Sequence, residues 1–289
     1  MMKKRILAIG MIAMSLLAVS CSGDDDGPPT AVLTMQVVGL ETLTNNATYE
    51  GWIIVEGNPI STGKFTSTAT TQTFVVNADQ LNNATSFVLS VEPPNDSDPA
   101  PSDAKLLSGN FNGTTAEVRV NSVVGDFTSV SGKFIIASPT DMITDNEQNG
   151  IWFLDPNGGM PVAGLDLPTL PQGWKYEGWV IFNNTPVSTG TFSSLSGRDD
   201  SSPFSGNEDA PEFPGEDFLN NAPSPLNFPA DGDVRGKEVV ISLEPDPDFD
   251  QATPFFFKPL KGTAGQQLNP SVNTLAGNGT GPFGTVTRP

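Results

Sequence analysis

Short apolar runs alternate with polar, turn-forming segments along this chain, and no stretch of useful length shows helical periodicity. The runs are rich in aromatic and β-branched residues, the composition of strands that form a half-buried pleated surface. Strands at this spacing, with turn residues between them, predict an all-β fold of sandwich-like or barrel-like form. The expected strands lie at 31–40, 49–55, 60–65, 73–76, 85–93, 105–109, 132–137, 150–155, 176–182, 187–192, 238–245 and 257–262.

One hairpin pattern occurs twice, at 48–65 and again at 175–192. Each copy has Tyr-Glu-Gly-Trp, an apolar run, a turn with proline, and then Ser-Thr-Gly-x-Phe. The repeat includes the chain's only two tyrosines and two of its four tryptophans, so compositional bias is a poor explanation. We expect the chain to be a duplication. The aromatic residues at matching places are Tyr49, Trp52, Tyr176 and Trp179, and we expect them to pack in the core or on a strand face.

Two further features repeat. Gly63 and Gly190 follow the Ser-Thr pair of the return strand, where a glycine indicates a bulge or a close approach of backbone. Glu92 and Glu244 each end an apolar strand and precede a proline and an acidic loop. These residues are expected to define the fold of each copy.

The repeats predict two tandem, homologous β-sandwich-like domains, at 31–140 and 146–289. The boundary is placed in the polar loop between the strands at 132–137 and 150–155. The second copy carries an acidic insert at 198–237, rich in Ser, Pro, Asn and Phe. A long loop of this kind is functional or mobile, and any distinguishing activity is expected there.

The N-terminus has the pattern of an export signal. Residues 1–20 contain three basic residues, an apolar run too short to span a membrane as a helix, and small residues before Cys21. Cys21 is the chain's single cysteine, and Leu17 to Cys21 resembles a bacterial lipobox. This predicts that Cys21 is acylated and anchors the mature chain, while 21–30 form an acidic tether. The alternative is an ordinary cleaved signal with an incidental cysteine.

The residues after Cys21 refine the expected location. Ser22 resembles the pattern of lipoproteins sent to the outer membrane. The acids at 24–26 resemble the export tag of surface-displayed lipoproteins, although a solvated linker would look the same. We therefore expect an outer-membrane lipid anchor, with the chain facing the periplasm or the cell surface.

Charge narrows the range of partners. The chain has 33 acidic residues against 14 basic ones, for a formal net charge of -19. Nucleic acid requires a basic surface, so it is a poor partner. The expected partners are the membrane, through the lipid, and either another envelope protein or a glycan.

The repeated motifs resemble a known family. Tyr-Glu-Gly-Trp, the turn with proline, Ser-Thr-Gly-x-Phe and the later Ser-x-Glu-Pro are similar to the extracytoplasmic C-terminal domain of the anti-sigma-K factor family. The resemblance implies a β-domain outside the cytoplasmic membrane. In that family a cytoplasmic helical domain and one transmembrane helix precede this domain, whereas a lipoprotein signal is expected here. The resemblance therefore implies fold and compartment rather than binding of a sigma factor.

The residue types leave little catalytic chemistry. The chain has no histidine, which excludes histidine-dependent triads and the commonest metal ligand. Glycoside hydrolysis needs only two carboxylates, and the repeated pairs Glu50 with Glu92 and Glu177 with Glu244 are its candidates. In so acidic a chain, repeated acids at strand ends are more often structural. We expect no enzyme activity and no cofactor.

Calcium is a weaker hypothesis, because no segment has the regular alternation of an EF-hand loop. The acidic segments concerned are the insert and 246–250. Within the insert, the candidate calcium ligands are Asp199, Asp200, Asp209 and Asp217.

The sequence thus predicts a non-catalytic, lipid-anchored envelope protein with a binding or structural role. One alternative is an accessory sensor or regulator of an envelope signalling system. Another is a carbohydrate-binding or carbohydrate-active surface protein.

Overall fold

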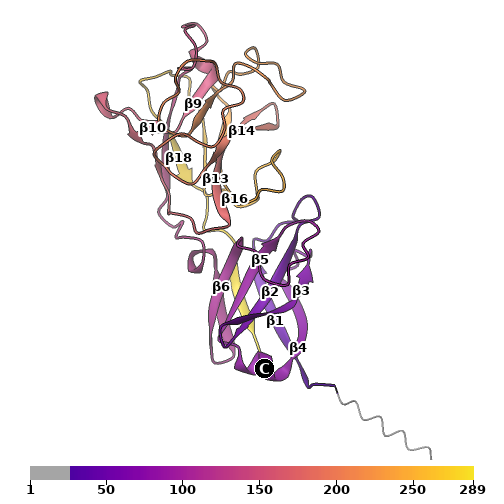
Figure 1. The fold of residues 1–289 in the computed structure, drawn as a ribbon. Helices are drawn as coiled ribbons and strands as arrows, with labels where there is room; N and C mark the ends of the chain where they lie inside the picture. Colours follow the sequence, from indigo (N-terminus) through magenta and orange to yellow (C-terminus); the bar gives the residue numbers. More distant parts are fainter. Residues whose placement is uncertain (1–26) are drawn as a thin grey trace, which may run out of the picture.

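A computed structural model describes residues 27–289 and confirms the all-β fold class. It forms two β-bodies arranged end to end (Figure 1). The helices are short: α1 (Ala78–Asn83) and the 3-10 turns η1 (Val120–Ser122), η2 (Glu147–Asn149) and η3 (Asn157–Gly159).

The first body is one antiparallel sheet of eight strands in the order β3-β2-β5-β6-β7-β19-β1-β4. The edge strands β3 and β4 lie near each other, so the sheet curls into a nearly closed barrel. Its strands are β1 (Thr30–Val38), β2 (Thr48–Val55), β3 (Asn58–Phe65), β4 (Thr71–Asn77), β5 (Ser86–Glu92), β6 (Lys105–Asn112), β7 (Thr115–Arg119) and β19 (Phe283–Thr287).

The second body has its main sheet in the order β14-β13-β16-β17-β18-β8-β9-β15, with β12 paired to β8. A separate two-stranded ribbon joins β10 to β11. The strands are β8 (Ser131–Ile136), β9 (Gly150–Trp152), β10 (Leu154–Asp155), β11 (Val162–Ala163), β12 (Leu165–Asp166), β13 (Trp174–Phe182), β14 (Thr185–Phe192), β15 (Gly215–Asp217), β16 (Glu238–Pro245), β17 (Leu260–Thr263) and β18 (Asn273–Gly277).

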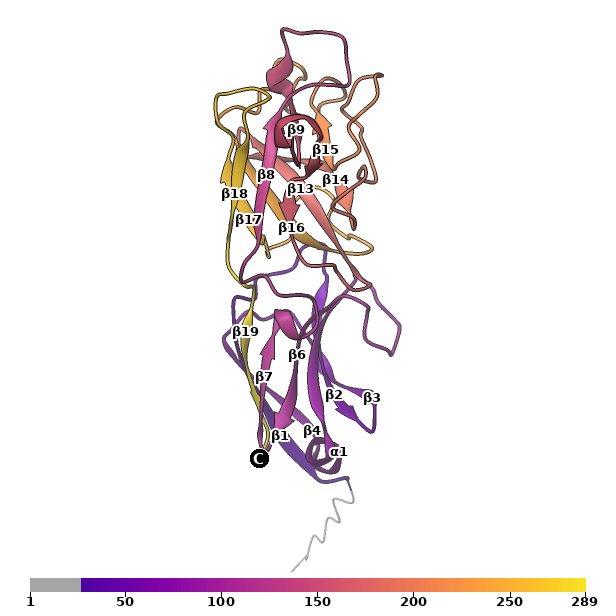
Figure 2. The same ribbon diagram turned by 90° about the vertical axis from the view of Figure 1, so that its left-hand side faces the viewer.

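The sheets do not divide the chain within 138–149, where the sequence placed the boundary. β8 precedes that loop but pairs with β18 and β9 of the second sheet. The last strand, β19, returns to the first sheet and lies between β7 and β1 (Figure 2). Both exchanges join segments far apart in sequence, which local composition does not reveal.

The repeated motif folds as the same hairpin in both bodies, β2–β3 and β13–β14. Two residues close each turn, Glu56-Gly57 in the first and Asn183-Asn184 in the second, and all four have positive φ. Positive φ at both central positions gives a turn whose twist matches that of the strands. Glycine and asparagine tolerate this backbone conformation best, which explains their use here.

The apolar core runs through both bodies as one cluster. At the junction, the Trp174 indole donates a hydrogen bond to the carbonyl of Lys105, 3.2 Å away. Nearby, the rings of Phe127 and Phe257 meet edge to face, with centroids 5.0 Å apart. Tryptophan and phenylalanine bury large areas, so these contacts hold the two bodies together.

Candidate functional site: a repeated carboxylate network

Strand alternation separates two kinds of side chain on β2. Tyr49 and Ile53 point into the apolar core, whereas Glu50 and Trp52 lie on the opposite face. Glu50 and Trp52 are nevertheless buried, with exposed fractions of 5% and 2%. The opposite face of this sheet therefore carries a second, polar interior.

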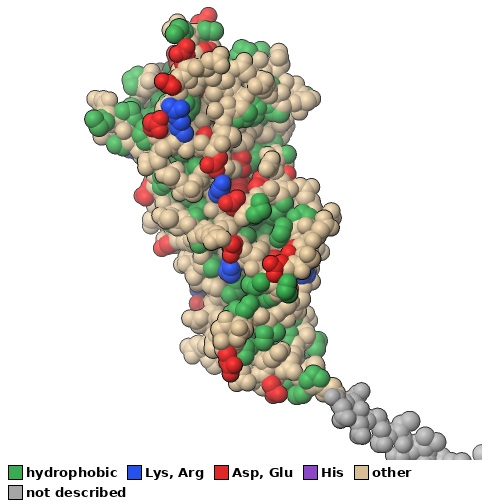
Figure 3. All heavy atoms as spheres, viewed as in Figure 1, with side chains coloured by type: hydrophobic (Ala, Val, Ile, Leu, Met, Phe, Trp, Pro, Cys, Tyr) green, Lys and Arg blue, Asp and Glu red, His purple; other side chains and the backbone are tan. Residues whose placement is uncertain are grey.

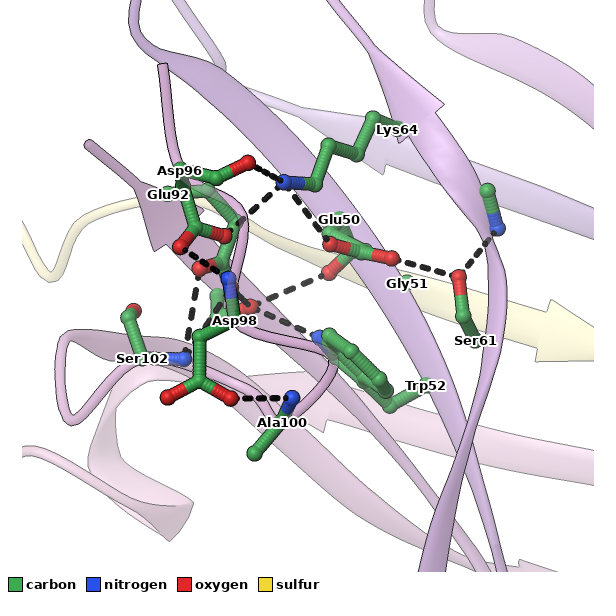
Figure 4. Close-up of polar contacts among 12 residues, drawn as sticks. Glu50, Gly51, Trp52, Ser61, Lys64, Glu92, Asp96, Asp98, Ala100 and Ser102 are labelled. Carbon is green, nitrogen blue, oxygen red and sulfur yellow. Dashed lines mark hydrogen bonds and ion pairs between the residues drawn. The ribbon is translucent and has the colours of Figure 1, made fainter. Parts of the chain in front are cut away.

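Hydrogen bonds join the buried polar side chains on this face of the first body into a network (Figure 4). The Trp52 indole donates to the Ser90 hydroxyl at 2.8 Å, and Ser90 in turn donates to the Glu92 carboxylate. The backbone amide of Ser102 also donates to Glu92. On the neighbouring strand, Ser61 donates to Glu50. Buried carboxylates are stabilised only when such donors surround them.

The second body repeats the tryptophan, serine and glutamate contacts of this network. Trp179 donates to the Ser242 hydroxyl at 2.8 Å, and Ser242 donates to Glu244. Ser188 donates to Glu177, as Ser61 does to Glu50. The two networks occupy equivalent strands, since β2 lies between β3 and β5, and β13 lies between β14 and β16.

The repeated tyrosines also make equivalent contacts. Tyr49 donates to the carbonyl of Glu41, and Tyr176 donates to the carbonyl of Pro168, each eight residues upstream. Both rings are buried, and burial raises the pKa of both phenols. Each tyrosine therefore ties the hairpin to the segment that precedes it.

Both return strands carry glycine at the same position because the backbone there has a positive φ. Gly63 has φ +115° and Gly190 has φ +105°, in the region that favours glycine. Each amide donates to the serine two residues before it, at 3.0 and 2.9 Å. The hairpin register shifts beside each glycine, which is the bulge that the sequence indicated.

The two networks differ in one charge. In the first body Lys64 lies 2.8 Å from Asp96 and 3.8 Å from Glu50. The position that pairs with the repeated glutamate in the second body is Thr191, which carries no charge.

The pKa shifts follow this difference. Hydrogen bonding to Lys64 lowers the pKa of Asp96, whereas burial raises that of Glu92. Burial raises the pKa of Glu177 to about 7 and that of Glu244 well above its ordinary value. Burial also raises the pKa of Asp248, the counterpart of Asp96. The second network thus holds its carboxylates without the lysine that compensates the first.

Comparison with known families gives one match. Residues 26–105 match the family model described as "Anti-sigma-K factor rskA, C-terminal". No curated protein and no solved structure matches the chain.

The matched segment contains β1 to β5 and ends as β6 begins, so it includes the whole first network. It covers less than a third of the chain and does not reach the second copy. An anti-sigma-factor-like domain is thereby supported for the first copy.

The carboxylates named as glycosidase candidates lie in these networks. Glu50 and Glu92 occupy one, and Glu177 and Glu244 occupy the other. The structure adds Asp96 and Asp248 to these pairs. The sequence contained the signal for both, because each aspartate follows its Glu-Pro by the same number of residues.

The structure does not bring the four calcium candidates together. Asp199 accepts the amide of Gly215, Asp200 pairs with Lys175, and Asp209 is exposed. Asp217 is fully buried and accepts hydrogen bonds from the Thr140 amide and the Trp152 indole. In residues 27–289 the one group of three acids spaced to hold a metal is Glu177, Glu244 and Asp248.

Cys21 and the expected signal peptide at 1–20 lie outside the described residues, as does most of the expected tether. Among the residues that are described, none belongs to a helix long and apolar enough to cross a membrane.

Proposed function

We propose that this protein is a lipid-anchored, extracytoplasmic protein of the cell envelope whose two β-bodies bind a partner without catalysis. The observation that carries the proposal is the family match at 26–105. In the family that the repeated motifs resemble, the corresponding domain lies outside the cytoplasmic membrane. The lipobox-like segment ending at Cys21 supports the anchor, because an acylated cysteine holds a protein at a membrane when more than one chain is attached.

Burial of the repeated carboxylates supports a non-catalytic role. Glu92 and Glu244 are each 1% exposed, and each carboxylate accepts hydrogen bonds from a serine hydroxyl and a backbone amide. A glycosidase acid must reach the glycosidic oxygen of a bound sugar. Side chains as little exposed as these serve better as internal braces for the sheet than as acids that must reach a sugar.

The equivalent networks support an origin by duplication. The same tryptophan, serine and glutamate contacts and the same strand neighbours recur, although the second copy holds about 25 more residues between its Tyr-Glu-Gly-Trp motif and its Glu-Pro motif. We propose that one ancestral β-body was doubled and that the exchange of β8 and β19 later joined the copies.

A regulatory role is the second candidate, and the family match favours it specifically. In this version the first body, which carries the match, contacts a component of an envelope signalling system. Acidic side chains recur along the face seen in Figure 3, and basic ones are few. Such a surface repels anionic polymers such as nucleic acid and favours a protein partner.

Affinity purification of the tagged, full-length protein from its own envelope, after brief crosslinking, tests the proposal. We expect a discrete membrane or periplasmic protein to co-purify; a component of a sigma-factor system would support the regulatory version. A Cys21→Ser chain is the control for contacts that depend on the anchor. Recovery of a polysaccharide alone, or hydrolysis of one by the purified chain, would contradict the proposal in favour of a carbohydrate-directed role.

A further inference from the structure

The second network gathers three acids close together. One carboxylate oxygen from each of Glu177, Glu244 and Asp248 lies within 4.8 Å of the others. No lysine or arginine of residues 27–289 lies within 4.0 Å of these carboxylates. Carboxylates this close repel one another strongly where water is excluded, so the group requires protons or a cation.

A second observation points to a ligand. Glu177 is 4% exposed, and its Oε2 atom has no hydrogen-bond partner, while Oε1 accepts from Ser188. A buried charged oxygen without a partner is costly and calls for an explanation such as an absent ion.

The first body shows what fills the equivalent place. There the Oε2 atom of Glu50 also lacks a hydrogen bond, but the Lys64 ammonium lies 3.8 Å from it and also pairs with Asp96. The molecule thus contains its own comparison, in which a lysine pairs with two of the three equivalent acids, Glu50 and Asp96.

Two lysines lie beside the second network, and both have other partners. Lys258, whose charge interacts with Glu244, donates to the Phe255 carbonyl 3.0 Å away, and Lys175 lines the same cleft as the three acids. Lys175 lies 2.8 Å from Asp200 and 3.9 Å from Asp246. Thr191, which replaces the first body's lysine, donates its hydroxyl to Asp200 as well. The three acids are therefore left to an external cation.

We propose that Glu177, Glu244 and Asp248 form a calcium site in the second body. The ligands are all oxygens, as a hard cation requires, and Ca²⁺ binds oxygens at about 2.3–2.6 Å, so one ion can touch atoms separated by up to about 5 Å. Mg²⁺ demands shorter bonds and near-octahedral geometry, which an irregular set of three carboxylates does not supply.

The site is open to solvent on one side. A cleft of about 570 Å³ is lined by all three acids together with Thr191 and Ser188. It admits the ion and the water molecules that complete a coordination shell of six to eight oxygens.

Calorimetric titration of the full-length protein, stripped with EDTA and then titrated with CaCl₂, tests the proposal. We expect one ion per chain, with a dissociation constant on the order of 0.1–1 mM, as in extracellular calcium modules, and binding at least tenfold weaker for MgCl₂. The midpoint temperature of thermal unfolding is expected to rise with CaCl₂, because a ligand that binds only the folded state stabilises that state.

Two variants and one control separate a metal site from a purely structural cluster. Thr191→Lys places a lysine at the position equivalent to Lys64 of the first body. This variant is expected to lose calcium binding, and its metal-free form is expected to unfold at a higher temperature. Asp248→Asn removes one ligand at a half-buried position and is expected to weaken binding at least tenfold with the fold intact by circular dichroism. Glu50→Gln alters the first network only, and it is expected to bind one calcium ion as the unmodified chain does.

The proposal would be overturned if the unmodified chain bound no stoichiometric calcium, if Mg²⁺ bound as tightly, or if the Thr191→Lys chain bound calcium normally. It stands apart from the proposed envelope role, since neither the anchor nor a protein partner enters the titration.

Discussion

At the residue scale, the two bulge glycines offer a matched pair. A Cβ at Gly63 would meet nothing within 4 Å, whereas one at Gly190 would lie 2.6 Å from the Asp199 side chain and 2.8 Å from the Ser201 carbonyl. Gly63→Ala is therefore expected to cost only backbone strain, about 1–2 kcal/mol, and Gly190→Ala distinctly more. Urea denaturation of both variants measures this difference. Equal losses of stability would contradict the close approach at Gly190.

Glu216 gives a prediction for pH. It is fully buried, and burial raises its pKa to about 8 from an ordinary 4.5, although Ser205 and the Phe204 amide donate to it. Between these values the folded state keeps a proton that the unfolded state releases. Stability therefore falls as pH rises from about 4.5 to 8, by roughly 1.4 kcal/mol for each unit of raised pKa.

Glu216→Gln supplies the control, because the amide resembles the protonated carboxyl and does not titrate. The free energy of unfolding, measured in EDTA at pH 5 and pH 8, is expected to fall less in the variant than in the unmodified chain. An identical fall in both proteins would show that Glu216 is ionised in the folded state.

Some residue roles could be predicted from the sequence and others could not. The aromatic pattern predicts burial of Trp52 and Trp179, and both are buried. Their hydrogen bonds to Ser90 and Ser242 depend on the register of a strand about forty to sixty residues away, which no local pattern specifies. The repeated spacing of Asp248 from Glu-Pro marks it as the counterpart of Asp96, but its approach to Glu177 depends on the non-local pairing of β13 with β16.

At the scale of elements, the two repeated hairpins agree with the sequence, because turn residues and alternation are local signals. The six-residue helix α1 was missed. It is too short to show periodicity, although Asn77 caps it by accepting the amide of Gln80.

Strand β19 provides a test of the topology. It pairs with β1 on one side and β7 on the other, and its Val286 is fully buried. Deleting residues 282–289 leaves β1 paired only with β4, and β7 paired only with β6. Hydrogen exchange is expected to show faster exchange of β1 and β7 amides, with little change in β13 and β16.

Arg288→Ala is the matched control for this deletion. Arg288 donates to the carbonyls of Leu81, Ala84 and Gly113 but contributes no ladder pairing in the sheet. The Arg288→Ala chain is expected to show a smaller rise in amide exchange than the deletion does, confined to α1 and the β6–β7 turn. Unchanged protection of β1 and β7 after the deletion would contradict the placement of β19.

At the scale of the whole molecule, the sequence predicted an all-β chain but misplaced its division. Each copy was expected to hold its own consecutive strands. Instead β8 and β19 belong to the body opposite the one that their sequence position suggested, so the chain crosses the junction more than once. Such crossings make the two bodies depend on each other, and composition carries no signal for them.

The central claim is that this pair of β-bodies is held at a membrane through Cys21. Mass spectrometry of the N-terminal peptide from the membrane fraction tests it most directly. We expect the mature chain to begin at Cys21 with its thiol and amino group carrying acyl-containing groups, and a Cys21→Ser chain to leave the outer-membrane fraction. An unmodified Cys21, or a peptide in which Ser20 still precedes it, would contradict the claim.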